Sequence, residues 1–322
     1  MILSFTVAAI LSPCITNKRI IMNTRLAVIV LFISSAGWGL TWLPIKGLNE
    51  MGLDSMHLIF IAFISGALVL FPWLVKQFKY WQTSIGFMLM IALAGGFANA
   101  SFQTAMFHGD VIRVMILFYL LPVWSVLGGW MFLKERIVRL RFIAVIICLA
   151  GAFIILDVLH TSWQGISWID LLAIGSGMGL AATNILFRFT QHVPVMSKVS
   201  SMFIGCTIIM GGFLMASNTT ATLPDNSAIP LAIAYGAIWL TLISIGTQWA
   251  VTRMEAGRSA IIIVMELVVA VGSVALMTAA ELKLHEMIGG LMVIGAAILE
   301  GSRGSDDSVP EVSDEIIAEL KK

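Results

Sequence analysis

The chain has 322 residues, of which 59% are hydrophobic and only 11% are charged, and its formal net charge is +1. Soluble domains carry about 25% charged residues, so this composition excludes an ordinary water-facing globular surface. The near-neutral balance gives no indication of a nucleic-acid partner. Long stretches almost without charge match what a lipid bilayer requires, because hydrocarbon penalises charged and unpaired polar groups.

Residues 1–24 precede the main pattern of apolar runs. The segment Met1–Pro13 is apolar, but no Lys or Arg stands before it, and a secretory signal needs a positive start. Lys18 and Arg19 follow it instead. We interpret residues 1–24 as an N-terminal extension with Met22 as a second possible start, and a cleaved signal as the alternative.

Ten apolar runs predict an all-α membrane protein with ten transmembrane helices. Most of the runs reach the roughly 20 residues that are needed to cross hydrocarbon. They cover residues 26–45, 55–75, 84–107, 112–133, 138–158, 166–189, 196–216, 228–252, 258–280 and 284–300.

The positions of Lys and Arg predict the orientation of these spans. If the N-terminus is inside, sixteen of the nineteen basic residues fall in inner segments, and only Lys46, Arg113 and Lys283 fall outside. The positive-inside rule therefore predicts a multi-pass protein of the inner (plasma) membrane with both termini in the cytoplasm. Residues 301–322 form a polar cytoplasmic tail in this interpretation.

Spans four and nine indicate an internal repeat. A shift of 146 residues places Glu135 on Glu281, at the end of each span, and a shift of 145 places Gln103 on Gln248. Five spans per copy is an odd number, so the second copy would enter the membrane from the other side, as in many secondary transporters. The two inverted five-helix repeats are predicted at residues 25–158 and 159–300.

Three short motifs carry a family resemblance: Gly37-Trp38-Gly39, Leu120-Leu121-Pro122 and Lys134-Glu135-Arg136. With them the chain resembles the drug/metabolite transporter (DMT) superfamily, with two EamA-type repeats over about residues 25–300. The resemblance implies a basket of ten helices around a central cavity.

Further motifs look like one branch of that superfamily, the amino acid exporters that include aromatic amino acid exporters. They are Arg113-Val114-Met115, the run from Phe118 to Trp124, and Met265-Glu266-Leu267. This resemblance implies export of amino acids or related metabolites. The second repeat departs from the first, since Leu267 or Val268 stands where the first has Pro122.

Charged residues inside spans are the first candidates for a functional site. Glu266 lies near the middle of span nine, where a charged acid costs at least about 2.5 kcal/mol. It could couple transport to protons or contact a substrate amine, or it could be a neutral acid bonded to a neighbouring helix. Arg113, at the outer start of span four, could bind a substrate carboxylate through its planar fork or lie at the interface as an ordinary snorkelling arginine.

Aromatic and neutral polar residues inside the spans form a second group of candidates. The aromatic rings could line a path for solute or simply pack, and the amides could line a cavity or bond between helices. The substrate-binding or coupling candidates in this group are Trp38, Tyr119, Trp124, Asn99, Gln103, Asn184 and Gln248. Pro122 frees the carbonyl of Phe118 and permits a kink, which could be a hinge or a static bend.

Together these features predict a secondary transporter that exports small organic metabolites by alternating access. The expected partners are a small-molecule solute, protons as the candidate coupling ion, and lipid. No cofactor or metal is expected, because the Cys and His residues lack ligand spacing and the ATP-binding Gly-x-x-x-x-Gly-Lys-[Ser/Thr] pattern is absent from the sequence. The alternatives are an uncoupled facilitator or uptake carrier, a membrane sensor or scaffold, and an intramembrane enzyme using Ser176.

Overall fold

The structure is a computed structural model that describes residues 24–161, 165–217, 228–278 and 281–302. Within these ranges the chain is helical and contains no β-strand. The helices are α2 (Thr24–Gly39), α3 (Trp42–Glu50), α4 (Ser55–Lys76), α5 (Phe78–Trp81), η1 (Gln82–Ser84), α6 (Ile85–His108), α7 (Val111–Phe118), α8 (Leu121–Leu133), α9 (Arg139–Ile155), η2 (Val158–His160), α10 (Trp168–Phe189), α11 (Val195–Ser217), α12 (Ala228–Ala234), the π-helical turn η3 (Tyr235–Leu240), α13 (Thr241–Val251), α14 (Ala256–Ile263), α15 (Met265–Thr278) and α16 (Leu284–Gly301).

Nine of the ten predicted spans coincide with helical segments that are long and apolar enough to cross a membrane, counted over the described residues. The predicted fifth span is the helix α9, which has 17 residues. That length is at the short end of what a membrane crossing needs. The prediction of an all-α multi-span membrane protein is confirmed, while residues 1–23 and 303–322, which hold nearly all of the predicted extension and tail, lie outside the described residues.

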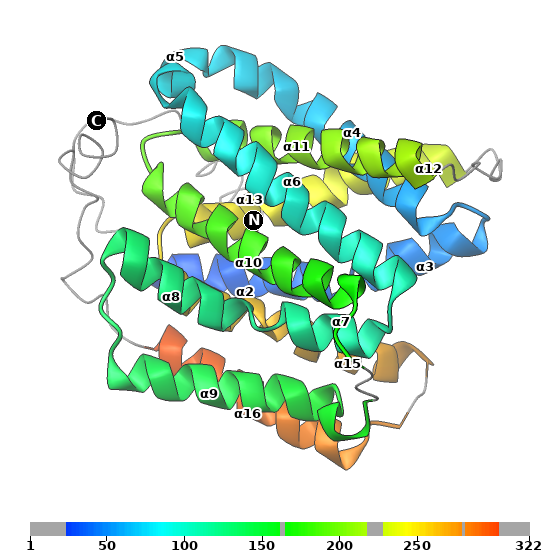
Figure 1. Cartoon of the computed structure of the whole chain (residues 1–322), viewed down its shortest axis with the longest axis vertical. Helices are drawn as coiled ribbons and strands as arrows, with labels where there is room; N and C mark the ends of the chain where they lie inside the picture. The colour runs from blue at the N-terminus through cyan, green and yellow to red at the C-terminus, as the bar shows by residue number, and fades with distance from the viewer. Residues whose placement is uncertain (1–23, 162–164, 218–227, 279–280, 303–322) are drawn as a thin grey trace.

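The long helices run back and forth across the molecule, as Figure 1 shows. We call the end where α2 begins and α16 ends the terminal end, and the end where α7 and α10 begin the opposite end. The terminal end lies at the left of Figure 1. Two contacts join helix ends there: the Arg258 side chain donates to the carbonyl of Gly301 at 2.6 Å, and the Ser84 side chain lies in hydrogen-bond contact with His192 at 2.8 Å.

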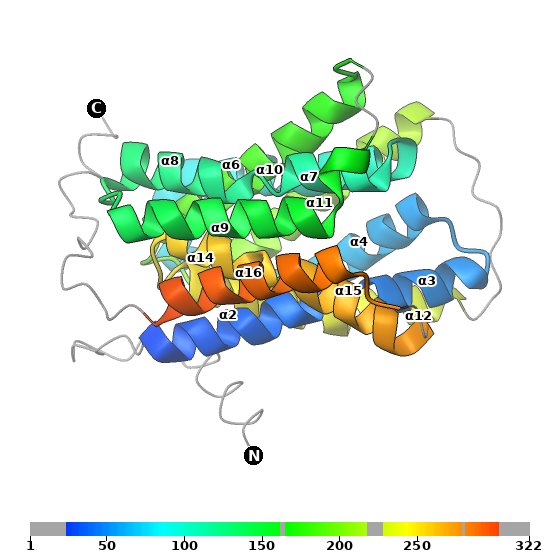
Figure 2. The ribbon, with the colours of Figure 1, turned by 90° about the horizontal axis from the view of Figure 1, so that it is seen from below.

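Close packing of small residues holds the bundle together. The helix α6 lies between α10 and α11, and α9 runs along α16 in both ribbon views (Figures 1 and 2). Gly151 of α9 and Gly289 of α16 meet so closely that a Cβ added at Gly289 would lie 2.5 Å from the carbonyl oxygen of Gly151. In lipid such backbone contact replaces the hydrophobic drive that assembles helices in water.

The periphery of the bundle is apolar. Large side chains on four different helices, namely Leu93, Leu171, Ile208 and Leu291, have between 62% and 68% of their surface exposed. A soluble protein would not expose so much apolar surface around its circumference. This belt faces the lipid, so the polar groups that could handle a solute must be sought inside.

Candidate solute site at two helix breaks

Two membrane spans are interrupted at corresponding places. The first consists of α7 and α8, and the second of α14 and α15. An offset of 145 residues carries Val111 to Ala256 and Phe118 to Ile263, which are the first and last residues of α7 and α14. The two broken spans begin at opposite ends of the bundle and therefore run in opposite directions. Paired interruptions of this kind mark the binding site in many transporters.

The two breaks have different chemical causes. In the first, Pro122 is the second residue of α8 and has no amide hydrogen to give to the carbonyl of Phe118. In the second, no proline is present, and α14 ends at Ile263 while Glu266 stands in the first turn of α15. A negative charge is favoured there by the helix dipole. Nothing in the sequence signals this second interruption, apart from the acid itself.

One hydrogen bond joins the two breaks. The Tyr119 hydroxyl, from the first break, donates to Glu266 Oε1 at 3.1 Å. Tyr119 is only 2% exposed, whereas Glu266 is half-buried. Both residues were candidates from the sequence, but the sequence does not place them together. The structure makes them a pair that links the first five spans to the last five.

The Gly37-Trp38-Gly39 motif fits α2 between two helices of the second half. A Cβ at Gly37 would lie 2.6 Å from Ile243 Cγ2 on α13, and one at Gly39 would collide with the backbone carbonyl of Glu266 on α15. Trp38 Nε1 donates to Thr247 Oγ1 at 3.1 Å. The motif therefore positions α2 beside the acid, and Trp38 is tied to α13 by a bond that the sequence did not predict.

Asn184 and Gln248 also meet inside the bundle. Gln248 Nε2 donates to Asn184 Oδ1 at 3.3 Å, and the two residues are 3% and 1% exposed. Among the described residues, three buried polar atoms of this region have no hydrogen-bond partner: Asn184 Nδ2, Gln248 Oε1 and Trp124 Nε1. Trp124 packs with apolar residues of α2, α10, α13 and α14. Unsatisfied buried groups are rare and costly, so water or solute is expected to bind them.

The other two amide candidates are not connected to this centre. Asn99 Nδ2 donates to the carbonyl of Gly95 in its own helix at 2.8 Å, and Gln103 is half-buried one turn later. Neither is joined by a hydrogen bond to Tyr119 or Glu266 within the described part of the chain. Their predicted role in lining a cavity stays a prediction, as does the central cavity itself.

Arg113 forms an ion pair at the opposite end. Its Nε lies 2.7 Å from Asp170 Oδ1, and its Nη2 lies 2.6 Å from Asp170 Oδ2. Asp170 also belongs to the capping box that starts α10 at Ser167. The fork that could bind a solute carboxylate is thus engaged by a protein carboxylate, and the solute-binding role of Arg113 stays a prediction.

A second group of charges is buried at the terminal end, and the sequence reasoning missed it. Arg141 lies 3.2 Å from Glu300 and 4.0 Å from Glu135, and it also pairs with Glu255. Arg188 lies 3.6 Å from Glu135. Burial raises the pKa of the Glu135 carboxyl, while Arg188 opposes that rise. We call these five residues the terminal-end cluster. In the sequence, Glu135 shows only that a span ends there, where a charge is ordinary.

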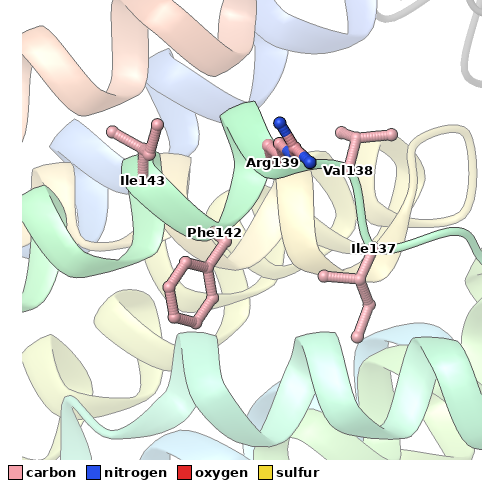
Figure 3. Close-up of a pocket in the computed structure, with 5 residues that line it drawn as sticks. All are labelled: Ile137, Val138, Arg139, Phe142 and Ile143. Atoms are coloured by element: carbon pink, nitrogen blue, oxygen red, sulfur yellow. The ribbon is translucent and has the colours of Figure 1, made fainter.

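A shallow groove of about 430 Å³ lies on the flank of the molecule, beside the start of α9. Figure 3 shows its lining: Ile137, Val138, Arg139, Phe142 and Ile143. Phe142 is 60% exposed, so the groove belongs to the lipid-facing surface rather than to the interior. Across the described residues, no group of three or more His, Cys, Asp and Glu side chains is arranged to hold a metal ion.

Comparison with known proteins agrees with this architecture. Residues 25–157 match the EamA-like transporter family. The uncharacterized transporter YojE of Bacillus subtilis (strain 168) is 33% identical over 143 residues, which is 41% of this chain and 47% of that relative. The match thus spans about half of the relative's length.

A solved structure, described only as the crystal structure of a protein, superposes with a TM-score of 0.69 at 14% identity. The superposition covers 85% of this chain and 97% of the other. At this identity the likeness shows the fold alone. The chain is therefore a multi-span helical membrane protein whose residues 25–157 resemble the EamA-like transporters, a family of the DMT superfamily.

Proposed function

We propose that the protein is a secondary transporter that moves a small organic solute through the space beside the two helix breaks. The observation that carries this proposal is the hydrogen bond between Tyr119 and Glu266, which joins two spans broken at corresponding places. Half-helix ends inside a membrane offer backbone groups and dipoles to a solute. The match of residues 25–157 to a transporter family supports the same conclusion.

Alternating access between two inverted repeats, residues 25–158 and 159–300, is part of the proposal. Support comes from the ends of the broken spans. An acid precedes each first half-helix, Asp110 before α7 and Glu255 before α14, and an arginine is the third residue of each, Arg113 and Arg258. All four keep the offset of 145 residues. Two related halves of opposite direction can exchange inward-facing and outward-facing shapes with little difference in energy.

We further propose that the terminal end faces the cytoplasm and that the membrane is the inner (plasma) membrane. The terminal end carries most of the basic residues that the structure describes, among them Lys76, Lys79, Lys134, Arg136 and Arg253. An excess of Lys and Arg is typical of cytoplasmic loops. This assignment also places the described ends of the chain, at α2 and α16, on the cytoplasmic side.

Amino acids are the solutes that we propose to test first, with export as the direction. The resemblance to amino acid exporters supports this class, and Glu266 could accept an ammonium group. The partner for the carboxylate would be Arg113 only if it leaves Asp170. Glu266 is also the proposed site for a coupled proton. An uncoupled facilitator or an uptake carrier for another small solute is the alternative.

The test is solute flux in proteoliposomes that contain the purified protein, with a panel of labelled amino acids and other small metabolites. Accumulation above that of empty liposomes, blocked competitively by one class of unlabelled solute, is expected. The Asn184→Ala variant should weaken transport by raising the KM, because it removes the partner of Gln248. Absence of flux for the whole panel, with a folded protein, would reject the transporter function.

A further inference from the structure

The terminal-end cluster gathers five charged side chains from five separate segments. Arg141 of α9 is its centre: Nε lies 3.2 Å from Glu300 Oε1 of α16, and Nη2 pairs with Glu255 at the start of α14. Glu135, in the loop between α8 and α9, accepts the backbone N–H of Ala256 at 3.0 Å. The cluster therefore binds the fourth and fifth spans to the ninth and tenth.

These charges are enclosed by the protein. The Arg141, Glu135 and Glu300 side chains are 2%, 5% and 0% exposed, and Glu255 is 18% exposed. The backbone makes room for the guanidinium, since a Cβ at Gly257 would lie 2.9 Å from Arg141 Cδ. A cluster of buried ion pairs adds little net stability compared with apolar packing, but the loss of one partner is severe. Such a group favours one arrangement of the helices over others.

The opposite end is held differently. Within the described ranges, its one ion pair between the two halves joins Arg113 of α7 to Asp170 of α10. On α15 the residues toward that end are half-buried or exposed, and Leu276 is 87% exposed. Charge pairs within 4 Å thus fasten α14 and α16 to the first half at the terminal end, whereas at the opposite end Lys283 and His285 attract Asp157 over longer distances.

We infer that Arg141 is the positioning residue that keeps the transport path closed at the terminal end, by holding α9 and the α8–α9 loop against α14 and α16. This inference rests on the proposed transport function. When the path opens at that end, Arg141 must leave Glu255 and Glu300, and water must take their place. Glu255, the most exposed member, lies where water first enters.

Accessibility of a buried thiol tests the closure without any knowledge of the solute. Ser125 of α8 is 0% exposed and follows the first helix break, and its neighbour Val126 lies against Gly257. The reporter is Ser125→Cys in a chain whose native cysteines are replaced by alanine. The probe is a charged, membrane-impermeant maleimide, applied to protein in nanodiscs so that both ends are reachable.

The comparison is between Arg141→Gln and a matched control, Arg139→Gln. Both residues lie in the first turn of α9, but the exposed Arg139 has no part in the cluster. If the open state is normally a minor one, populated at about 0.1–10%, Arg141→Gln is expected to raise the labelling rate of the reporter about tenfold or more. The control should leave it within about twofold. A second reporter, Ser101→Cys on α6, lies nearer the opposite end, and its labelling rate should not rise.

Unchanged labelling of Ser125→Cys in folded Arg141→Gln would overturn the inference. If Arg141→Gln does not fold, the labelling rate of Ser125→Cys is measured in Glu255→Gln instead, because that variant removes one charge at the partly exposed edge of the terminal-end cluster. Flux assays on the same variants separate the two proposals. Faster labelling without flux in any variant would support the closure by Arg141 and reject the transport function. Flux with unchanged labelling would support the transport function and reject the closure by Arg141.

Discussion

The two broken spans differ in chemistry although they break at the same place. The first contains Pro122 and buries Tyr119 at its break, while the second has no proline and carries Glu266 in the first turn after it. The first break can be understood from a missing hydrogen-bond donor. The second depends on its surroundings, in particular the close approach of Gly39 to the carbonyl of Glu266. A repeated architecture can therefore divide its roles, with one half supplying a rigid partner and the other the ionisable group.

The largest effect is expected from removing the acid at Glu266, which distinguishes the second broken span from the first. Glu266→Gln keeps the size and a hydrogen bond to Tyr119 but loses the charge. The hydrogen bond that a solute ammonium group would donate to the charged carboxylate contributes about 1.5–3 kcal/mol, so its loss is expected to lower flux roughly 10–150-fold. The dependence of flux on pH should also flatten in proteoliposome assays.

Its control is Glu281→Gln, since Glu281 is an exposed acid beyond the end of the same span. That variant should transport like the unmodified protein. An unchanged rate and an unchanged pH profile in Glu266→Gln would show that the acid is only a packing element.

The next effect concerns the contact between α2 and the second break. Gly39→Val places a side chain against the Glu266 carbonyl and Val269, where a Cβ would lie 2.9 Å from Val269 Cβ. Overpacking of this kind costs about 1–3 kcal/mol. A lower midpoint of thermal unfolding in detergent is expected. Gly47→Ala on α3 is the matched control, because no atom lies within 4 Å of its added Cβ, and an equal loss in both would refute the role of close contact.

A smaller effect is expected at the first break. Tyr119→Phe keeps the ring but removes the hydroxyl that donates to Glu266. A hydrogen bond contributes about 0.5–1.5 kcal/mol, so flux should fall by about 2–12-fold, less than in Glu266→Gln. If the two act as a pair, the double variant should be no worse than Glu266→Gln alone, whereas multiplied losses would show independent roles.

The smallest effect tests Pro122 itself. Pro122→Ala restores an amide hydrogen toward the carbonyl of Phe118, and the position near the start of α8 already tolerates proline. Stability is therefore expected to change by less than about 1 kcal/mol, while the rate of transport falls if the break is a hinge. Thermal unfolding and flux measured on the same preparation separate the two effects. A change in stability without a change in rate would identify Pro122 as a static bend.

Much of the site was visible in the sequence as single residues but not as an arrangement. Glu266 stood out because an acid in an apolar span is costly, and Asn184 and Gln248 stood out for the same reason. Their pairing was not visible, since Tyr119 contacts a residue 147 positions away and Asn184 contacts one 64 positions away. The sequence indicates the terminal-end cluster even less clearly, because Glu135, Glu255 and Glu300 stand at span ends, where charges are ordinary.

By itself the sequence determined the membrane class, the approximate spans and the candidate acid, because the bilayer imposes its cost on each residue according to its own chemistry and depth. Only the tertiary structure decided that Glu266 meets Tyr119, that Arg113 is engaged by Asp170, and that Arg141 collects three carboxylates. These contacts depend on how the helices rotate and approach one another. Small residues such as Gly39 and Gly257 set that approach, and in sequence they look like any other glycine of an apolar chain.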